Sequence, residues 1–167
     1  MLSAAAGCTD SSVVIAAAGN GQDFGIQLAG QPGHWFTAAA AAPVIPGATE
    51  QVLQASLGAI GDSAIVDLLG LGAMTTLGNG AQAPAAFAPI WPETALAPRK
   101  LLSARHPGFA QTQPQLVVRA ASVKDAATAP VVSLGVLDQA GLQGRLGGGF
   151  YRAPAELFAR ACAGLQP

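Results

Sequence analysis

Charged residues are scarce in this sequence. They make up 10% of the 167 residues, and eight basic and nine acidic side chains leave a net charge of -1. A typical soluble domain carries about 25% charged residues. No basic cluster extends beyond Arg99-Lys100, so the chain lacks the cations that bind nucleic-acid phosphates or anionic lipids. We therefore exclude nucleic acid and the membrane surface as partners.

Uninterrupted apolar runs and metal-binding clusters are also missing. The longest apolar stretch, 57–77, contains Asp62 and Asp67, and carboxylates are costly inside a membrane. Cys8 and Cys162 cannot form a disulfide framework, and the histidines have no H-x-x-x-H spacing. The N-terminus lacks the positive region of a signal peptide. The sequence predicts a cytoplasmic protein with reduced thiols and with neither metal nor cofactor.

The apolar content is sufficient for one core, and the length predicts a single domain, 1–167. Alternating apolar residues predict strands, whereas a spacing of three to four residues predicts helices. The predicted strands are 12–18, 24–28, 35–37, 116–118 and 131–137, with a turn at 19–21. The predicted helices are 1–7, 49–57, 62–77, 93–105, 122–127 and 154–165. These elements indicate an α+β fold, with antiparallel strands and with helices packed on one side.

The low charge also bears on association. A surface with so few charges exposes apolar side chains, and such surface commonly meets another chain. We expect a patch around Val13, Val14 and Ile15, and either protein partner subunits or a second copy of the chain.

Common catalytic loops are absent. Neither Lys100 nor Lys124 follows a glycine, as a phosphate-binding Walker loop requires. The stretch Gly61-Asp62-Ser63-Ala64-Ile65 stops one residue short of the G-x-S-x-G nucleophile motif.

One candidate site is Gly61, Asp62 and Ser63 at a predicted helix start. Asp62 is interpreted first as an N-cap that accepts a first-turn amide hydrogen bond. The alternative is that these amides and the Ser63 hydroxyl hold a carboxylate or phosphate. A capping carboxylate would compete for the same amides, so the two interpretations conflict, and the cap is favoured.

Two other segments carry candidate residues. His34 has a side chain suited to proton transfer, although a histidine beside Trp35 and Phe36 is more often a packing residue. The glycines Gly147, Gly148 and Gly149 would let a ligand approach the backbone, with Arg152 as an oxyanion ligand. The alternative is a flexible loop with a surface arginine. Asp67 is either a solvated or a functional carboxylate.

Four stretches of the chain resemble one known family and occur in the same order as in that family. The stretches are 7–30 (GCTDSSVVIAAAGNGQDFGIQLAG), Trp35-Phe36-Thr37-Ala38, Gly61-Asp62-Ser63-Ala64-Ile65 and 147–154 (GGGFYRAP). Together they resemble the C-terminal part of the YlbE-like family, a domain of unknown function. Its members include the AllG-type large subunit associated with oxamate carbamoyltransferase in allantoin breakdown.

The chain departs from that family at several positions. Ala39 stands where members usually have proline, Asp67 where they tend to have glutamate, and Leu137-Asp138 where a His-Lys pair is expected. Family members are also considerably longer, and residue 1 falls within their domain. The resemblance therefore implies a fragment of a larger α+β protein, a shortened gene product or one piece of an assembly.

The resemblance implies a subunit that transfers a carbamoyl group between the oxamate nitrogen and phosphate in purine catabolism. The substrates are small anions, and no metal is needed. His34, Asp62 and Ser63 are the implied catalytic residues, and Gly61, Gly147, Gly148, Gly149 and Arg152 the implied anion-binding residues. One alternative is a non-catalytic assembly subunit or truncated remnant. Another is a small amide hydrolase that uses Ser63.

Overall fold

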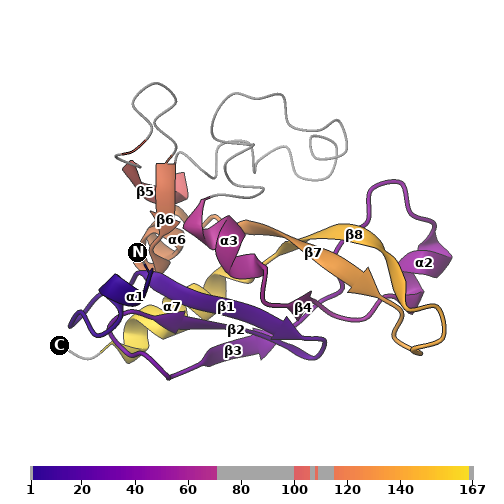
Figure 1. The fold of residues 1–167 in the computed structure, drawn as a ribbon, viewed down its shortest axis with the longest axis horizontal. Coiled ribbons are helices and arrows are strands. Elements are labelled where there is room, and N and C mark those ends of the chain that lie inside the picture. The colour runs from indigo at the N-terminus through magenta and orange to yellow at the C-terminus, as the bar shows by residue number, and fades with distance from the viewer. Residues whose placement is uncertain (1, 71–99, 106–107, 109–114, 166–167) are drawn as a thin grey trace.

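The computed structural model describes residues 2–70, 100–105, 108 and 115–165. It shows an α+β protein in which every named strand pair is antiparallel. The predicted fold class is confirmed. Both α1 and the C-terminal end of α7 lie at one end of the long axis (Figure 1), and α2 lies at the other.

A four-stranded sheet forms the N-terminal part of the fold, with strand order β3-β2-β1-β4. Its members are β1 (Val14–Asn20), β2 (Asp23–Leu28), β3 (Phe36–Ala39) and β4 (Ile60–Gly61). The predicted hairpin is present because the Asn20 Oδ1 accepts hydrogen bonds from the amides of Gln22 and Asp23, at 2.9 and 2.7 Å. Gly21 takes a φ of +90° in that turn, a conformation that favours glycine.

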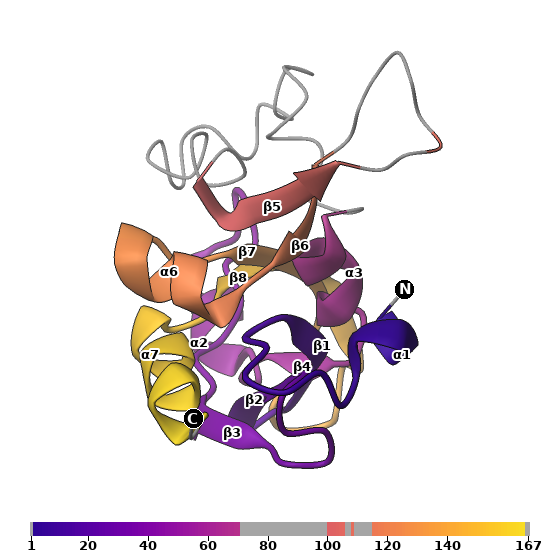
Figure 2. The same cartoon turned by 90° about the vertical axis from the view of Figure 1, so that its left-hand side faces the viewer.

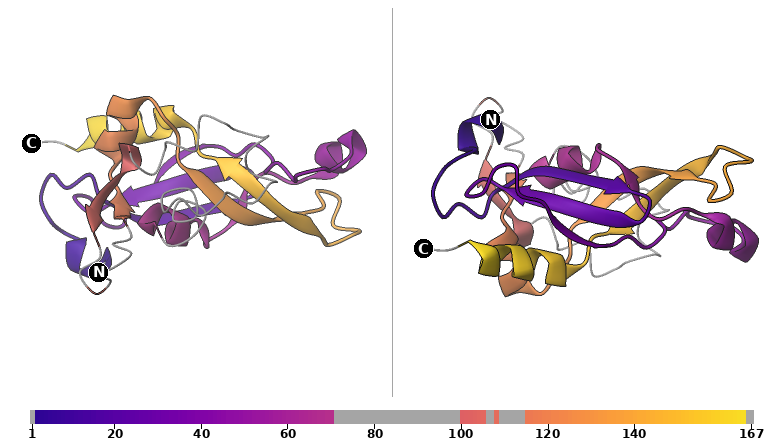
Figure 3. Two further views of the ribbon diagram at one scale, coloured as in Figure 1. Left: turned by 90° about the horizontal axis from the view of Figure 1, so that it is seen from above. Right: turned by 90° about the horizontal axis from the view of Figure 1, so that it is seen from below.

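Two separate hairpins complete the strands. One pairs β5 (Leu102–Arg105) with β6 (Gln115–Val118), and the other pairs β7 (Val131–Leu137) with β8 (Arg145–Arg152). Seen from above and below (Figure 3), the β7–β8 hairpin reaches past the four-stranded sheet toward α2.

Five helices are found in the described part of the chain. They are α1 (Leu2–Ala5), α2 (Glu50–Ala55), α3 (Ala64–Leu69), α6 (Ala120–Ala126) and α7 (Ala155–Gly164). Helix α3 packs against β1, β6 and β7, and α6 packs against α7, as Figure 2 shows. Two hydrogen bonds of 2.5 Å join α7 to the region of β3, from Arg160 to the Thr37 carbonyl and from Gln31 to the Gly164 carbonyl. No helix among these residues is long and apolar enough to cross a membrane.

The core joins the sheet to the β7–β8 hairpin. Phe24 of β2 is fully buried, and its ring centroid lies 5.0 Å from that of Tyr151 in β8. The Tyr151 hydroxyl is buried and has no hydrogen-bond partner within the described ranges. Burial raises the pKa of Tyr151 to about 12, because desolvation disfavours the phenolate.

Several predicted element boundaries are wrong. The predicted helix 62–77 ends at Gly70, whose φ of +94° closes α3, and residues 71–77 lie outside the described ranges. Of the predicted helix 93–105, residues 93–99 lie outside the described ranges, and Leu102–Arg105 form a strand. The glycines 147–149 lie inside β8 rather than in a flexible loop. Pro154 is the N-cap of α7 and precedes its first turn.

The predicted apolar patch at the first strand is also wrong. Val14 is buried, and Val13 and Ile15 are half-buried, because α1 and α3 pack against β1. The large apolar side chains that are exposed within the described ranges are Trp35, Val66 and Leu142.

Asp138 organises the loop between β7 and β8. Its carboxylate accepts hydrogen bonds from the backbone amides of Gln143, Leu142 and Ala140, at 2.9, 2.8 and 3.2 Å. The Gln143 amide contributes most to a lowering of the Asp138 pKa below its ordinary value of 3.8, and burial opposes this shift. The residue that departs from the family pattern therefore has a structural role in this chain.

This carboxylate makes stability depend on pH. Because the folded pKa lies below the unfolded value, Asp138 stabilises the fold fully above about pH 4. That contribution is lost as the pH falls through the folded pKa. We expect Asp138→Asn to lower the melting temperature at pH 7, and the difference from the wild type to shrink below pH 4. Thermal unfolding measured from pH 3 to 7 tests this, and a difference that does not vary with pH would contradict it.

Cys162 is half-buried on α7, and Cys8 is exposed. Burial is the main cause that raises the Cys162 pKa, and Asp125 also raises it while Lys124 opposes both. Since the thiolate is the reactive form, Cys162 should react with a disulfide reagent about tenfold more slowly than Cys8 at pH 7.5. Labelling of the Cys8→Ser and Cys162→Ser variants separates the two rates. Equal rates in the folded chain would show that α7 is not docked as described.

Candidate functional site

A pocket lies between the β7–β8 hairpin, the start of α3 and the segment before α2. Its volume is about 580 Å³. It is lined by Ile45, Pro46, Ser63, Ser133, Leu134, Gly135, Arg145, Gly148, Gly149 and Phe150. The structure thus brings together Ser63 and the glycine run, two segments that the sequence pointed to separately. We call this hollow the Ser63 pocket.

The backbone of the segment before α2 is held directly to β8. Val44 exchanges hydrogen bonds with Phe150, with N–O distances of 2.8 and 2.9 Å. This bridge fixes Ile45 and Pro46 as one wall of the Ser63 pocket.

A β-bulge places a cation in the Ser63 pocket. Ser133 pairs with Phe150 and Gly135 with Gly148, so these four residues share one face of the hairpin. Strict alternation along β8 would put Arg145 on the other face. The register shift between Val136 and Leu137 adds one residue to β8 and sets Arg145 opposite Leu137. Arg145 was missed in the sequence because a bulge has no simple sequence signal.

Glycines make room for the Arg145 side chain along the hairpin. Its Nε donates a hydrogen bond to the Gly147 carbonyl at 3.2 Å, and a Cβ on Gly135 would lie 3.7 Å from that Nε. In the part of the chain that the structure describes, no carboxylate pairs with this guanidinium. Arg145 is therefore a cation available to an anionic ligand.

A buried carboxylate lies behind the Ser63 pocket. Asp67 of α3 is 2% exposed, and its Oδ2 accepts hydrogen bonds from the Ser133 amide at 2.8 Å and from the Ser133 hydroxyl at 3.3 Å. Asp67 is thus neither solvated nor a pocket-lining group. It joins α3 to β7 and fixes the direction of the Ser133 hydroxyl.

The predicted Asp62 cap is wrong. The N-cap residue of α3 is Ser63, and its side chain makes no capping hydrogen bond. Asp62 is exposed, and its backbone carbonyl accepts the Ile65 amide hydrogen bond at 3.3 Å. Gly61 has a φ of +115° and precedes this turn. The Ser63 hydroxyl is consequently not engaged in capping.

The three consecutive glycines have different surroundings. A Cβ on Gly149 would lie 2.7 Å from the Val136 Cγ2 and 3.0 Å from the Pro43 Cβ, whereas one on Gly148 would have no atom of the described residues within 4 Å. Gly149 is required by the close approach of the segment 43–44, and Gly148 opens onto the Ser63 pocket.

We expect Gly149→Ala to lower the free energy of unfolding by about 2 kcal/mol, because the new methyl group displaces this segment. Gly148→Ala should change it by less than about 0.5 kcal/mol. Urea denaturation of both variants measures the difference. Equal losses would show that β8 does not pack against Pro43 as described.

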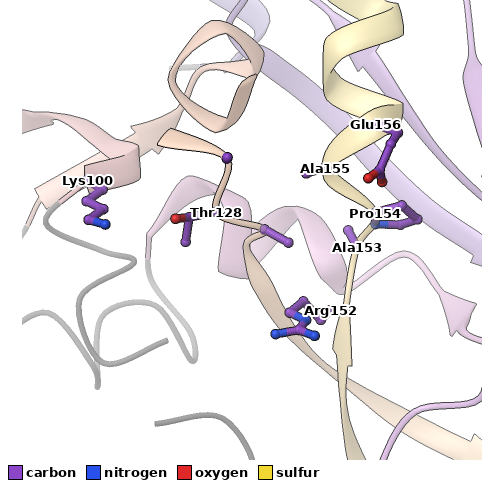
Figure 4. A pocket seen from close by; sticks show the side chains of 9 residues that line it. Lys100, Thr128, Arg152, Ala153, Pro154, Ala155 and Glu156 are labelled. Carbon is purple, nitrogen blue, oxygen red and sulfur yellow. The ribbon is translucent and has the colours of Figure 1, made fainter. Parts of the chain in front are cut away.

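Arg152 lies in a different hollow of about 440 Å³ (Figure 4), whose lining includes Lys100, Thr128 and Glu156. Arg152 and Lys100 bring two cations to it, and Glu156 adds a carboxylate from the first turn of α7. The structure therefore separates Arg152 from the Ser63 pocket.

His34 lines neither hollow. It is exposed before β3, and its ring packs edge-on against Phe36 with centroids 4.5 Å apart. This ring contact gives His34 a packing role beside β3.

The Ser63 pocket is suited to binding and orientation. Among the described residues, its lining provides one guanidinium and two hydroxyls, and includes neither histidine nor carboxylate. No cluster of metal-binding side chains occurs among the described residues. The described residues of this pocket can hold and polarise an anion but supply no general base.

Comparisons with known proteins give two matches. A family model described as oxamate carbamoyltransferase subunit AllG matches residues 1–63. A crystal structure of a conserved protein of unknown function from Enterococcus faecalis V583 matches with a TM-score of 0.78 and 22% identity. That match covers 98% of this chain and 41% of the other, and at this identity it shows the fold alone. No curated protein matches the chain.

The family match ends inside the site. Residues 1–63 contain the complete four-stranded sheet and α2, and the last matched residue, Ser63, lines the pocket. The resemblance to the AllG family of oxamate carbamoyltransferase subunits is confirmed over residues 1–63.

Proposed function

We propose that this chain is a subunit of an oxamate carbamoyltransferase and that it binds the small anionic substrate in the Ser63 pocket. The observation that supports this most directly is the AllG match, which ends at the pocket residue Ser63. The chain acts with partner subunits in the cytoplasm and needs neither metal nor cofactor.

The reaction joins the oxamate nitrogen to the carbamoyl carbon. The new C–N bond forms as the C–O bond to phosphate breaks, the departing phosphate takes the proton that the nitrogen loses, and oxalurate and hydrogen phosphate are released. Both reactants are anions, so their approach needs cationic and hydrogen-bonding groups. Arg145 and the Ser63 hydroxyl supply such groups here.

The other predicted site residues have secondary places in this proposal. Gly148 and Gly149 line the pocket, while Gly61 and Gly147 shape the adjoining backbone. Asp62 is exposed and precedes the pocket residue Ser63 in the chain. Arg152 would attract the anionic substrates from its separate hollow, and His34 would take part only through a contact with a partner subunit.

Reconstitution tests the proposal. This chain is combined with the other subunits of an oxamate carbamoyltransferase, and oxalurate formation from oxamate and carbamoyl phosphate is measured with and without it. We expect turnover only when the chain is present. Full turnover in its absence would refute the proposal.

A non-catalytic assembly subunit is the second candidate, and the absence of a base in the described pocket lining favours it. Under this alternative the chain binds its partners, yet Arg145→Gln leaves their turnover unchanged. An amide hydrolase that uses Ser63 is disfavoured for the same reason. Release of ammonia from oxalurate by the chain alone would support it.

A further inference from the structure

We propose that the Ser63 pocket recognises a carboxylate and an adjacent amide N–H of one small ligand, through Arg145 and Ser133 respectively. This inference rests on the proposed function for the identity of its substrate class, the amide carboxylates. It adds which group of the ligand each of the two side chains binds.

Arg145 is the carboxylate ligand. Its Nε is occupied by the Gly147 carbonyl, which orients the guanidinium and leaves the two Nη groups as donors. Arginine presents a planar pair of donors that match the two oxygens of a carboxylate. The Ser63 hydroxyl, free of any capping bond, adds a donor from the opposite wall.

Ser133 accepts a hydrogen bond from the ligand amide, because its own hydroxyl proton is already donated to Asp67. The Ser133 hydroxyl donates to the buried Asp67 carboxylate, and a hydroxyl has one proton and two lone pairs. The lone pairs therefore remain for the ligand, which makes Ser133 an acceptor. An amide N–H satisfies this acceptor, whereas a second carboxylate oxygen would be repelled.

The two groups lie on one surface. Ser133 and Arg145 are on the same face of the β7–β8 hairpin because of the bulge in β8, and both line the same pocket. The floor between them is formed by Gly135 and Gly148, which carry no side chains. A planar ligand such as oxamate can lie across this floor with one end at each group.

Three isosteric probes test the inference: oxamate, which has both groups; oxalate, which lacks the amide; and oxamide, which lacks the carboxylate. Binding to the full chain is measured by calorimetry. We expect oxamate to bind about tenfold more tightly than oxalate, because one hydrogen bond is lost and an acceptor is left unmatched. Oxamide should bind more weakly still. Equal affinities, or no binding of oxamate at millimolar concentration, would overturn the inference.

Two variants test which side chain binds the amide and which binds the carboxylate of the ligand. Ser133→Ala should abolish the preference for oxamate over oxalate, because it removes both the acceptor of the amide hydrogen bond and the lone pairs that repel the second carboxylate; oxamate affinity falls and oxalate affinity does not. Arg145→Gln should weaken both ligands at least tenfold. Arg119→Gln, at an exposed arginine outside the pocket, removes the same charge and should bind as the wild type does. An Arg145→Gln variant that binds like Arg119→Gln would overturn the assignment.

The outcomes also separate this inference from the proposed function. If the reconstituted enzyme turns over and Arg145→Gln neither binds nor reacts differently, the function stands and the recognition scheme is refuted. If the binding series behaves as expected but no partner combination transfers a carbamoyl group, the recognition scheme stands and the function is refuted.

Discussion

Phe24→Ala is expected to lower the free energy of unfolding by about 4 kcal/mol. The ring is fully buried and packs against Tyr151, so its removal leaves a cavity between the four-stranded sheet and the β7–β8 hairpin. The residues that match the AllG family contribute Phe24, whereas Tyr151 comes from the hairpin that forms the pocket floor. Urea denaturation followed by circular dichroism measures the loss.

Trp35→Ala is the matched control. Tryptophan is larger than phenylalanine, but Trp35 is 44% exposed and lies over Gly25 on the sheet. Its removal should lower the free energy of unfolding by about 1 kcal/mol. A greater loss at Trp35 than at Phe24 would contradict the position of the core.

Asp67→Ala is expected to lower the free energy of unfolding by about 3 kcal/mol, because it leaves the half-buried Ser133 amide without its acceptor and removes a charge-assisted hydrogen bond. The change also frees the Ser133 hydroxyl to rotate. The preference for oxamate over oxalate should therefore decline together with stability. Denaturation and calorimetry on one preparation measure both effects.

Asp62→Ala is the matched control, because it removes the same type of side chain five residues before Asp67. Asp62 is exposed and precedes the N-cap residue Ser63, so the free energy of unfolding should change by less than about 0.5 kcal/mol. If Asp62 were the N-cap predicted from the sequence, the loss would be about 1 kcal/mol. Similar losses at Asp62 and Asp67 would contradict the geometry of α3.

The sequence predicted the elements whose signals are local. The β1–β2 hairpin follows from Asn20 and Gly21 in its turn, and β7 was predicted with its observed bounds, Val131–Leu137. The strand at Leu102–Arg105 was mistaken for a helix, because its pairing with β6 depends on residues distant in sequence. The local β-propensity of these residues carries no information about that pairing.

The candidate site was predicted only in part, because several of its contacts also join residues that are distant in sequence. Ser63 and the glycine run were found, but the glycines were assigned to a loop because glycine weakens a strand. In the structure, Gly149 stays in β8 because Pro43 and Val44 approach it closely. The carboxylate of Asp67 and the guanidinium of Arg145 acquire their roles only through long-range pairing and a bulge, neither of which the sequence displays.

The most direct test of substrate binding in the Ser63 pocket is an amide NMR titration of the wild-type chain with oxamate. We predict that the resonances of Ser63, Ser133, Gly135, Arg145 and Gly148 shift in a saturable manner, while those of Arg152 and Glu156 stay in place. Shifts confined to the hollow of Lys100, Arg152 and Glu156, or no saturable shift, would contradict it.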